Sequence, residues 1–131
     1  NVLYSIYDSK ITKMKGIPAV KQIVIVDRKY AVLDICGNVW QFENSMVGAG
    51  YLEFSSPVQS NLQNVKFLAG SSVLFFVGED GLLYYQREKG ESPENLSLQF
   101  PELKEISLIF SWKEYQRYEI CFANTRGDVL Q

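Results

Sequence analysis

Residues 74–85 read LFFVGEDGLLYY, two apolar runs joined by a polar turn that ends in Asp80-Gly81. An Asp-Gly pair between apolar runs favours a tight β-hairpin, because glycine readily adopts the positive φ that such a turn requires. The same pattern surrounds a glycine twice more, in YAVLDICGNVWQ at residues 30–41 and in ICFANTRGDVLQ at residues 120–131. The three turn glycines, spaced by 44 and 46 residues, are Gly37, Gly81 and Gly127. This self-similarity predicts a chain built from repeats, with these glycines as structural turn residues.

Another strand is expected ahead of each hairpin. The candidates are Val20 to Val26, Val65 to Leu68 and Ile106 to Phe110. Polar and apolar residues alternate from Lys104 to Ile109, as is typical of a half-buried strand. About four short strands in a period of roughly 40 to 50 residues match the size of a β-propeller blade.

The predicted fold is all-β, with three β-propeller-like blade repeats, each an antiparallel four-stranded sheet. Phased from glycine to glycine, the periods cover about residues 1–37, 38–81 and 82–127, and a next strand starts at 128–131. An immunoglobulin-like sandwich is the competing fold, but it gives no reason for a turn motif that occurs three times. Because a partial propeller leaves strand edges unpaired, we expect the repeat domain 1–131 to belong to a longer propeller chain or a larger assembly.

Two irregular segments are expected within this pattern. Residues 112–117 read as a loop insertion in the third repeat, and residues 87–95 read as an exposed polar loop. No segment has a convincing helical period. The sequon Asn95-Leu96-Ser97 matches an N-glycosylation site, but nothing else in the sequence indicates secretion.

Composition argues against several classes of function. The chain has no histidine, the commonest general base and zinc ligand, and its net charge is −2. We therefore predict no enzyme activity, no cofactor, no nucleic-acid partner and, since no apolar run approaches about 20 residues, no membrane insertion. The two cysteines, Cys36 and Cys121, are too few for a disulfide framework and are predicted to be small buried hydrophobes. A reducing intracellular compartment or a virion is favoured over secretion.

No catalytic or metal site is predicted, and the candidate residues are candidates for protein contact. The first group combines aromatic and cationic side chains, the composition of a binding hot spot: Trp112, Lys113, Tyr115 and Arg117. The second makes the first connection locally basic, which suits an acidic partner or a solvated loop: Lys10, Lys13 and Lys15. The carboxylates that could be imagined as an acid pair are expected to be structural turn groups: Asp27, Asp34, Glu79 and Asp80.

Residues 65–84, VKFLAGSSVLFFVGEDGLLY, resemble the repeat of the regulator-of-chromosome-condensation family. The family's Ala-Gly, apolar strand and Glu-Asp-Gly turn are matched by Ala69-Gly70, the run after Val73 and Glu79-Asp80-Gly81. The other two repeats keep the turn glycine and the apolar pattern. The resemblance implies a divergent β-propeller, used by some members as an interaction platform and by the best-known member to exchange nucleotide on the Ran small GTPase.

Three classes of function follow from these observations. The preferred one is a non-enzymatic protein-interaction or structural scaffold module built from propeller blades, which binds other proteins or further blades. A virion or effector component is one form of it, since the excess of Lys over Arg and the many Asn, Ile, Tyr and Phe residues are typical of an AT-rich genome. The alternative is a guanine-nucleotide exchange factor for a Ran-like small GTPase. An enzyme with an unusual propeller site is the third.

Overall fold

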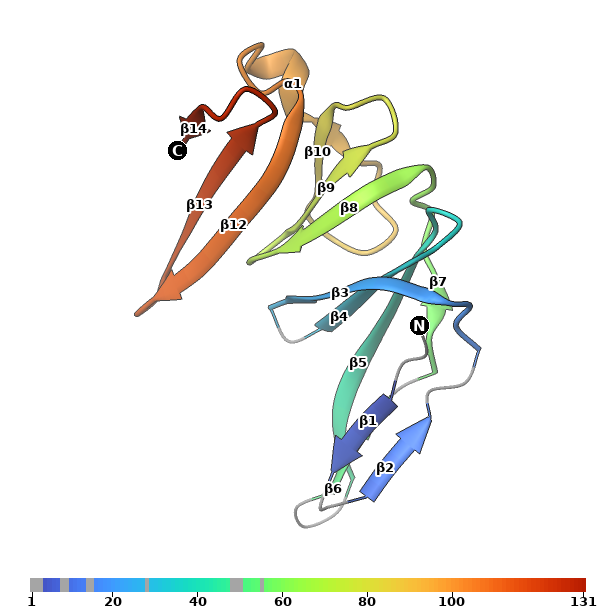
Figure 1. The fold of residues 1–131 in the computed structure, drawn as a ribbon. Helices are drawn as coiled ribbons and strands as arrows, with labels where there is room; N and C mark the ends of the chain where they lie inside the picture. Colours follow the sequence, from blue (N-terminus) through green and yellow to red (C-terminus); the bar gives the residue numbers. More distant parts are fainter. Residues whose placement is uncertain (1–3, 8–9, 14–15, 28, 48–50, 55) are drawn as a thin grey trace.

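The computed structural model describes the backbone of residues 4–7, 10–13, 16–27, 29–47, 51–54 and 56–131 (Figure 1). Side chains are described for residues 16–27, 29–43, 56–112, 115–117 and 119–131. Within these ranges the protein consists of antiparallel β-sheets and one short helix, so the predicted all-β class is confirmed. None of the described sheets closes on itself.

Three sheets follow one another along the chain, and we name them repeat 1, repeat 2 and repeat 3. Repeat 1 contains β3 (Val20–Val26), β4 (Lys29–Asp34), β5 (Val39–Val47), β6 (Tyr51–Phe54) and β7 (Val58–Gln59). Both β6 and β7 pair with β5. The first half of β5 pairs with β7, which gives the four-stranded order β3-β4-β5-β7, and its second half pairs with β6. A separate hairpin, β1 (Tyr4–Tyr7) and β2 (Lys10–Lys13), precedes this sheet.

Repeat 2 is a four-stranded meander and repeat 3 has three described strands. Repeat 2 contains β8 (Val65–Gly70), β9 (Leu74–Gly78), β10 (Leu83–Gln86) and β11 (Glu94–Asn95). The helix α1 (Leu96–Gln99) leads into repeat 3, which contains β12 (Ile106–Glu114), β13 (Arg117–Asn124) and β14 (Val129–Leu130). Each repeat of the structure therefore begins with the strand ahead of its glycine hairpin. The predicted periods, which run from one turn glycine to the next, instead divide each sheet at its hairpin turn.

The turn glycines Gly37, Gly81 and Gly127 have φ values of 85°, 77° and 89° and share one hydrogen-bond pattern. Each glycine N–H donates to the carbonyl oxygen three residues earlier, at 2.9–3.2 Å. The N–H of that earlier residue donates to the carbonyl just after the glycine, at 3.0–3.1 Å. This is the three-residue hairpin that places a left-handed residue at its bulge, and glycine adopts that conformation without a Cβ penalty. The three glycines thus lie in equivalent hairpins.

The repeats also share an irregularity that the residue pattern does not show. The first strand of each sheet shifts register at its second residue, between Val20 and Gln22, between Val65 and Phe67, and between Ile106 and Leu108. The residue just before each of these strands accepts a hydrogen bond at 2.8–3.0 Å from the backbone N–H of the residue that follows the second strand of the same sheet, which is β4, β9 or β13. These matching bulges define equivalent positions in the three repeats.

Most of the core lies between consecutive sheets, and a smaller cluster of Val20, Val32 and Phe42 lies within repeat 1. The first strands β3, β8 and β12 are neighbours in space, and we call them the inner strands. One apolar cluster, which includes Leu33, Val39, Leu68 and Phe76, fills the space between repeats 1 and 2. A second, which includes Val77, Leu83 and Ile106, fills the space between repeats 2 and 3. Figure 1 shows the resulting series of sheets, from β3–β5 through β8–β10 to β12–β13.

The predicted loop insertion in the third repeat is wrong. Residues 112–114 and 117–119 extend β12 and β13 as a paired hairpin, with Trp112 opposite Glu119 and Glu114 opposite Arg117. Apolar and polar residues continue to alternate through Phe110, Ser111 and Trp112, so the extra residues form strand rather than loop. The turn is only two residues long, and Tyr115 in it has a φ of 55°.

Three smaller features also differ from what the sequence suggests: the helix, the sequon and the cysteines. The helix α1 was not anticipated, because a single turn is too short to show a period; the Asn95 side chain caps it by accepting from the Leu98 N–H at 3.2 Å. Ser97 of the sequon is buried, with its hydroxyl bonded to Leu83 and Leu103. The cysteines are not buried: Cys36 is exposed in its hairpin turn, and Cys121 is half-buried on β13.

Candidate interaction site on the third repeat

Each repeat has two faces, which its strand register identifies. We call the face that packs on the following repeat the forward face, and the opposite one the rear face. In repeat 1 the forward positions Ala31, Leu33 and Val39 are at most 1% exposed, because they pack on the rear face of repeat 2. The equivalent forward positions of repeat 2 pack on repeat 3 and are at most 8% exposed: Phe75, Val77 and Leu83.

The forward face of repeat 3 is apolar and open to solvent. Its equivalent positions are Cys121 and Ala123, which are half-buried, and Val129, which is 71% exposed. On the same side of β12 lie Leu108 and Phe110, exposed by 58% and 60%. The apolar residues of this face are Leu108, Phe110, Trp112, Cys121, Ala123 and Val129.

An aromatic pair lies at the outer end of this face. The rings of Phe110 and Trp112 are 5.8 Å apart between centroids and tilted by 43°. The adjoining hairpin tip presents Tyr115 and Arg117, both exposed, and Glu119 lies opposite Trp112 across the strand pair. Aromatic rings beside a guanidinium group are the side chains that most often anchor protein interfaces.

Three of the predicted hot-spot residues therefore lie together, although on a strand hairpin rather than in a loop. Lys113 lies on β12 opposite Tyr118, and the description of that position is limited to its backbone. The basic group is elsewhere: Lys10 and Lys13 lie on β2, so their predicted place in a connection is wrong, and Lys15 lies outside the described residues. Figure 1 places β2 at the opposite side of the molecule from the β12–β13 hairpin.

The exposed residues Leu108, Phe110 and Val129 were not among the sequence candidates. Their apolar character reads as core, and alternation along a strand does not tell which face is covered. One signal was present: Leu108-Ile109-Phe110 is apolar on both sides of the strand, as in strands that are covered on two faces.

Two of the carboxylates considered as an acid pair, Asp34 and Asp80, accept hydrogen bonds within their own turns. Asp34 accepts hydrogen bonds from the Cys36 and Asn38 amides at 2.8 and 3.0 Å and from the Trp40 indole at 2.9 Å. Burial alone would raise the pKa of Asp34, but these donors together hold it below its ordinary value. In repeat 3, Asn124 accepts equivalent amide bonds from Arg126 and Asp128 at 3.0 and 2.9 Å.

Asp80 is likewise engaged within its own hairpin. It accepts the Tyr84 hydroxyl at 2.5 Å and the Leu82 amide at 3.0 Å. The hydrogen bond, with a contribution from burial, raises the pKa of Tyr84 to about 12. Among the described side chains, no group of three or more His, Cys, Asp or Glu residues could hold a metal ion. No helix in the described ranges is long and apolar enough to cross a membrane.

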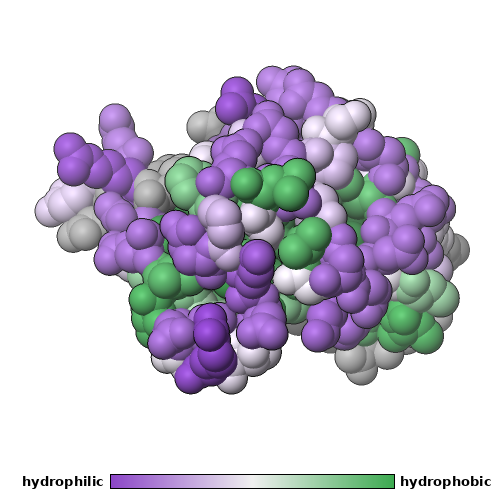
Figure 2. All heavy atoms as spheres, turned by 90° about the horizontal axis from the view of Figure 1, so that it is seen from above, coloured by the Kyte–Doolittle hydropathy of each residue, from purple (hydrophilic) through white to green (hydrophobic). Residues whose placement is uncertain are grey.

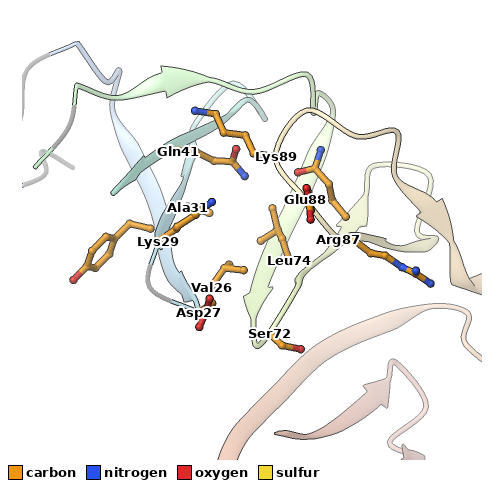
Figure 3. Close-up of a pocket in the computed structure, with 12 residues that line it drawn as sticks. Val26, Asp27, Lys29, Ala31, Gln41, Ser72, Leu74, Arg87, Glu88 and Lys89 are labelled. Atoms are coloured by element: carbon orange, nitrogen blue, oxygen red, sulfur yellow. The ribbon is translucent and has the colours of Figure 1, made fainter. Parts of the chain in front are cut away.

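A polar cavity of about 460 Å³ lies between repeats 1 and 2. Figure 3 shows Gln41, Glu88 and Lys89 around it, with Ala31 and Leu74 among its apolar residues. The Gln41 Oε1 atom is buried and has no hydrogen-bond partner among the described residues. The lining mixes cations with anions, and Lys29 is paired with Glu43 at 3.4 Å, so the cavity does not select a ligand by charge.

Figure 2 shows separate apolar areas within a mostly polar surface on the face seen there. No protein-family model matches the chain, and no curated protein matches it either.

Proposed function

We propose that this protein is a non-enzymatic protein-interaction or structural scaffold module, an arc of β-propeller blades in which the forward face of repeat 3 receives another protein or a further blade. The propeller assignment is supported by antiparallel sheets that pack face to face, and by inner strands that lie next to one another as around a propeller axis. The resemblance of residues 65–84 to the chromosome-condensation-regulator repeat agrees with it.

One observation carries the interaction role. The forward face of repeat 3 has apolar side chains at the positions that are buried in both preceding repeats. Burying a Leu, Phe or Val side chain contributes about 1.5–3 kcal/mol, so Leu108, Phe110 and Val129 together offer on the order of 5 kcal/mol to a partner. A contiguous apolar face of this kind marks a binding surface on a folded protein.

A charged side chain placed on the apolar face tests this role. Phe110→Lys places a charge in the centre of the face, and Leu98→Lys makes the same change at an exposed leucine on α1, away from it. The chain is immobilised and its saturable binding of proteins from a cell extract is measured. We expect the Leu98→Lys variant to bind as the wild type does, and Phe110→Lys to bind at least tenfold more weakly. Equal binding by all three would contradict the proposal. The exchange-factor alternative rests on the resemblance alone and stays a prediction.

A further inference from the structure

The cavity between repeats 1 and 2 has two glutamine oxygen atoms in its lining that accept no hydrogen bond from a described residue. The first is the buried Gln41 Oε1 on β5. The second is the Oε1 atom of Gln86 on β10, a residue that is 2% exposed. The Gln86 Nε2 atom is held in place, because it donates to the Asn61 side-chain oxygen at 3.1 Å and to the Glu91 carbonyl at 2.8 Å. An acceptor buried without a donor costs free energy, so both atoms point to a ligand or to ordered water in the cavity.

The cavity exists because repeat 1 has smaller or more polar side chains than repeat 2 at two equivalent positions. Ala31 and Gln41 are paired across β4 and β5 on the forward face of repeat 1. Their equivalents on the forward face of repeat 2 are Phe75 and Tyr85, paired across β9 and β10 with ring centroids 6.2 Å apart. Phe75 is buried against repeat 3, where it meets Phe122 edge-on. Aromatic rings therefore occupy this place between repeats 2 and 3, whereas between repeats 1 and 2 it is open and carries an amide.

Two charged side chains of the loop after β10 line the same cavity. They are Glu88 and Lys89, and Figure 3 shows them together with the Gln41 amide. Neither has an ion-pair or hydrogen-bond partner for its side chain among the described residues. Because their charges are opposite, they favour neither an anion nor a cation, yet they offer an acceptor and a donor. The other charged groups of the lining, of which both cations are paired with glutamates, are Asp27, Lys29 and Arg87.

We propose that this cavity binds a neutral sugar. An apolar ligand would leave the two glutamine oxygen atoms without donors, and a charged ligand would meet a like charge in Glu88 or Lys89. A hydroxyl group donates and accepts at one atom, so a ring with several hydroxyl groups can satisfy the amides, the carboxylate and the ammonium group together. Ala31 and Leu74 supply an apolar surface for the C–H groups of the ring. The volume of about 460 Å³ lies in the usual range for a small-molecule site.

This inference goes beyond the proposed function and rests on other residues. The cavity is lined by residues 26–41 and 72–89, whereas the interaction site lies on repeat 3. A sugar between the two sheets contacts both of them, because Gln41 belongs to β5 and Gln86 belongs to β10. The bound sugar is therefore expected to stabilise the packing of repeats 1 and 2, as a ligand of the folded state does.

Titration with neutral sugars, followed by saturation-transfer NMR, tests the proposal. The probes are glucose, galactose, mannose and N-acetylglucosamine, each added up to about 20 mM, which detects a millimolar dissociation constant. We expect the wild type to bind at least one of them. Ala31→Phe gives repeat 1 the residue that repeat 2 has at the equivalent position, so it is expected to fill the cavity and to abolish binding. Gln99→Leu changes an exposed glutamine on α1 and is expected to bind as the wild type does.

Gln41→Leu separates a binding role from a structural one. It removes the unpartnered acceptor and keeps a side chain of similar size, so sugar binding is expected to weaken about tenfold. Without sugar, the midpoint of thermal unfolding is expected to stay the same or to rise by about 3 °C, because a buried acceptor that has no donor is lost. A lower midpoint would show that the amide stabilises the fold, and would overturn the proposal.

The remaining outcomes are equally decisive. A wild type that binds none of these sugars would overturn the proposal, as would binding of glycine, a small zwitterion, in place of a sugar. Equal binding by the wild type, Ala31→Phe and Gln41→Leu would place the sugar elsewhere and would also overturn it. Near-ultraviolet circular dichroism checks that Ala31→Phe is folded, and if it is not, Gln41→Leu decides. The proposed function is judged separately, because Phe110→Lys is expected to bind sugar as the wild type does while it loses its protein partner.

Discussion

The middle strands of repeats 2 and 3, β9 and β13, occupy equivalent positions but differ in burial. All five residues of β9 are buried, whereas the described residues of β13 are half-buried or exposed apart from Asn124. The two strands have similar apolar sequences, Phe75-Phe76-Val77 and Cys121-Phe122-Ala123. Sheet packing accounts for the difference, because β9 lies between two repeats and the forward side of β13 faces solvent.

The geometry of the two hairpins is the same in spite of the difference in burial. The turns after β9 and β13 have the same hydrogen bonds and the same left-handed glycine, although one sheet is covered on both faces and the other on one. The hairpins are therefore set by local residues, and burial is set by neighbouring repeats. Stability in such a series is approximately a sum of repeat and interface contributions.

The largest difference in stability is expected when one equivalent side chain is shortened in each of the two sheets. Leu83 on β10 is fully buried, and its equivalent on β14 is the exposed Val129. Leu83→Ala leaves a cavity between repeats 2 and 3 and is expected to lower the free energy of unfolding by about 3 kcal/mol, whereas Val129→Ala costs under about 0.5 kcal/mol. Urea unfolding at one protein concentration measures both. Similar losses would mean that the forward face of repeat 3 is buried in the protein as it exists in solution.

A smaller effect is expected where the inner strands approach each other. Gly70 has no room for a Cβ beside the Ile25 carbonyl, while its equivalent Ser111 carries a side chain that donates to Gly70. Gly70→Ala forces repeats 1 and 2 apart and is expected to cost about 2–3 kcal/mol. Ser111→Ala removes one hydrogen bond and is expected to cost about 1 kcal/mol. Thermal unfolding of both variants ranks them, and the reverse order would show that the close approach of β3 and β8 is not rigid.

The repeat could be read from the sequence because its signal is local. Asp80-Gly81 and the glycines Gly37 and Gly127 mark positions that need a left-handed backbone, and the flanking apolar runs supply the paired strands. The all-β class follows from the same residues. By contrast, comparison with the shorter repeats makes Trp112 to Arg117 look like a loop insertion, so it does not predict the length of β12 and β13. The alternation of apolar and polar residues from Phe110 to Trp112 is the local signal that the strand continues.

The candidate site could be predicted only in part. Trp112, Tyr115 and Arg117 were recognised because aromatic and cationic residues stood outside the expected core pattern. Phe110 and Val129 were not, because an apolar residue on a strand has the same appearance whether or not a neighbour covers it. Coverage depends on how many sheets stack on each face, and this information is not contained in any single strand.

The smallest effect concerns the residue that begins each hairpin turn, where repeat 1 has Asp34 and repeat 3 has Asn124. Both side chains accept two backbone amides, but only Asp34 carries a charge and also accepts the Trp40 indole. Burial raises the pKa of Asp34, but the hydrogen-bond donors outweigh burial and lower the pKa in the folded protein. The ionised carboxylate therefore stabilises the fold above the unfolded pKa of 3.8, and this contribution is lost as the pH falls below 3.8 toward the folded pKa. Asp34→Asn converts the first turn to the chemistry of the third and removes this titration.

We therefore expect the wild type to lose more stability than Asp34→Asn between pH 5 and pH 3, and the two to respond alike above pH 5. Urea unfolding across this range, followed by tryptophan fluorescence, makes the comparison. Parallel pH profiles would show that the Asp34 carboxylate has the same pKa in the folded and unfolded chains. In that case the charge of Asp34 would add no pH-dependent stability, and the turns of repeats 1 and 3 would respond to pH alike although their sheets differ in burial.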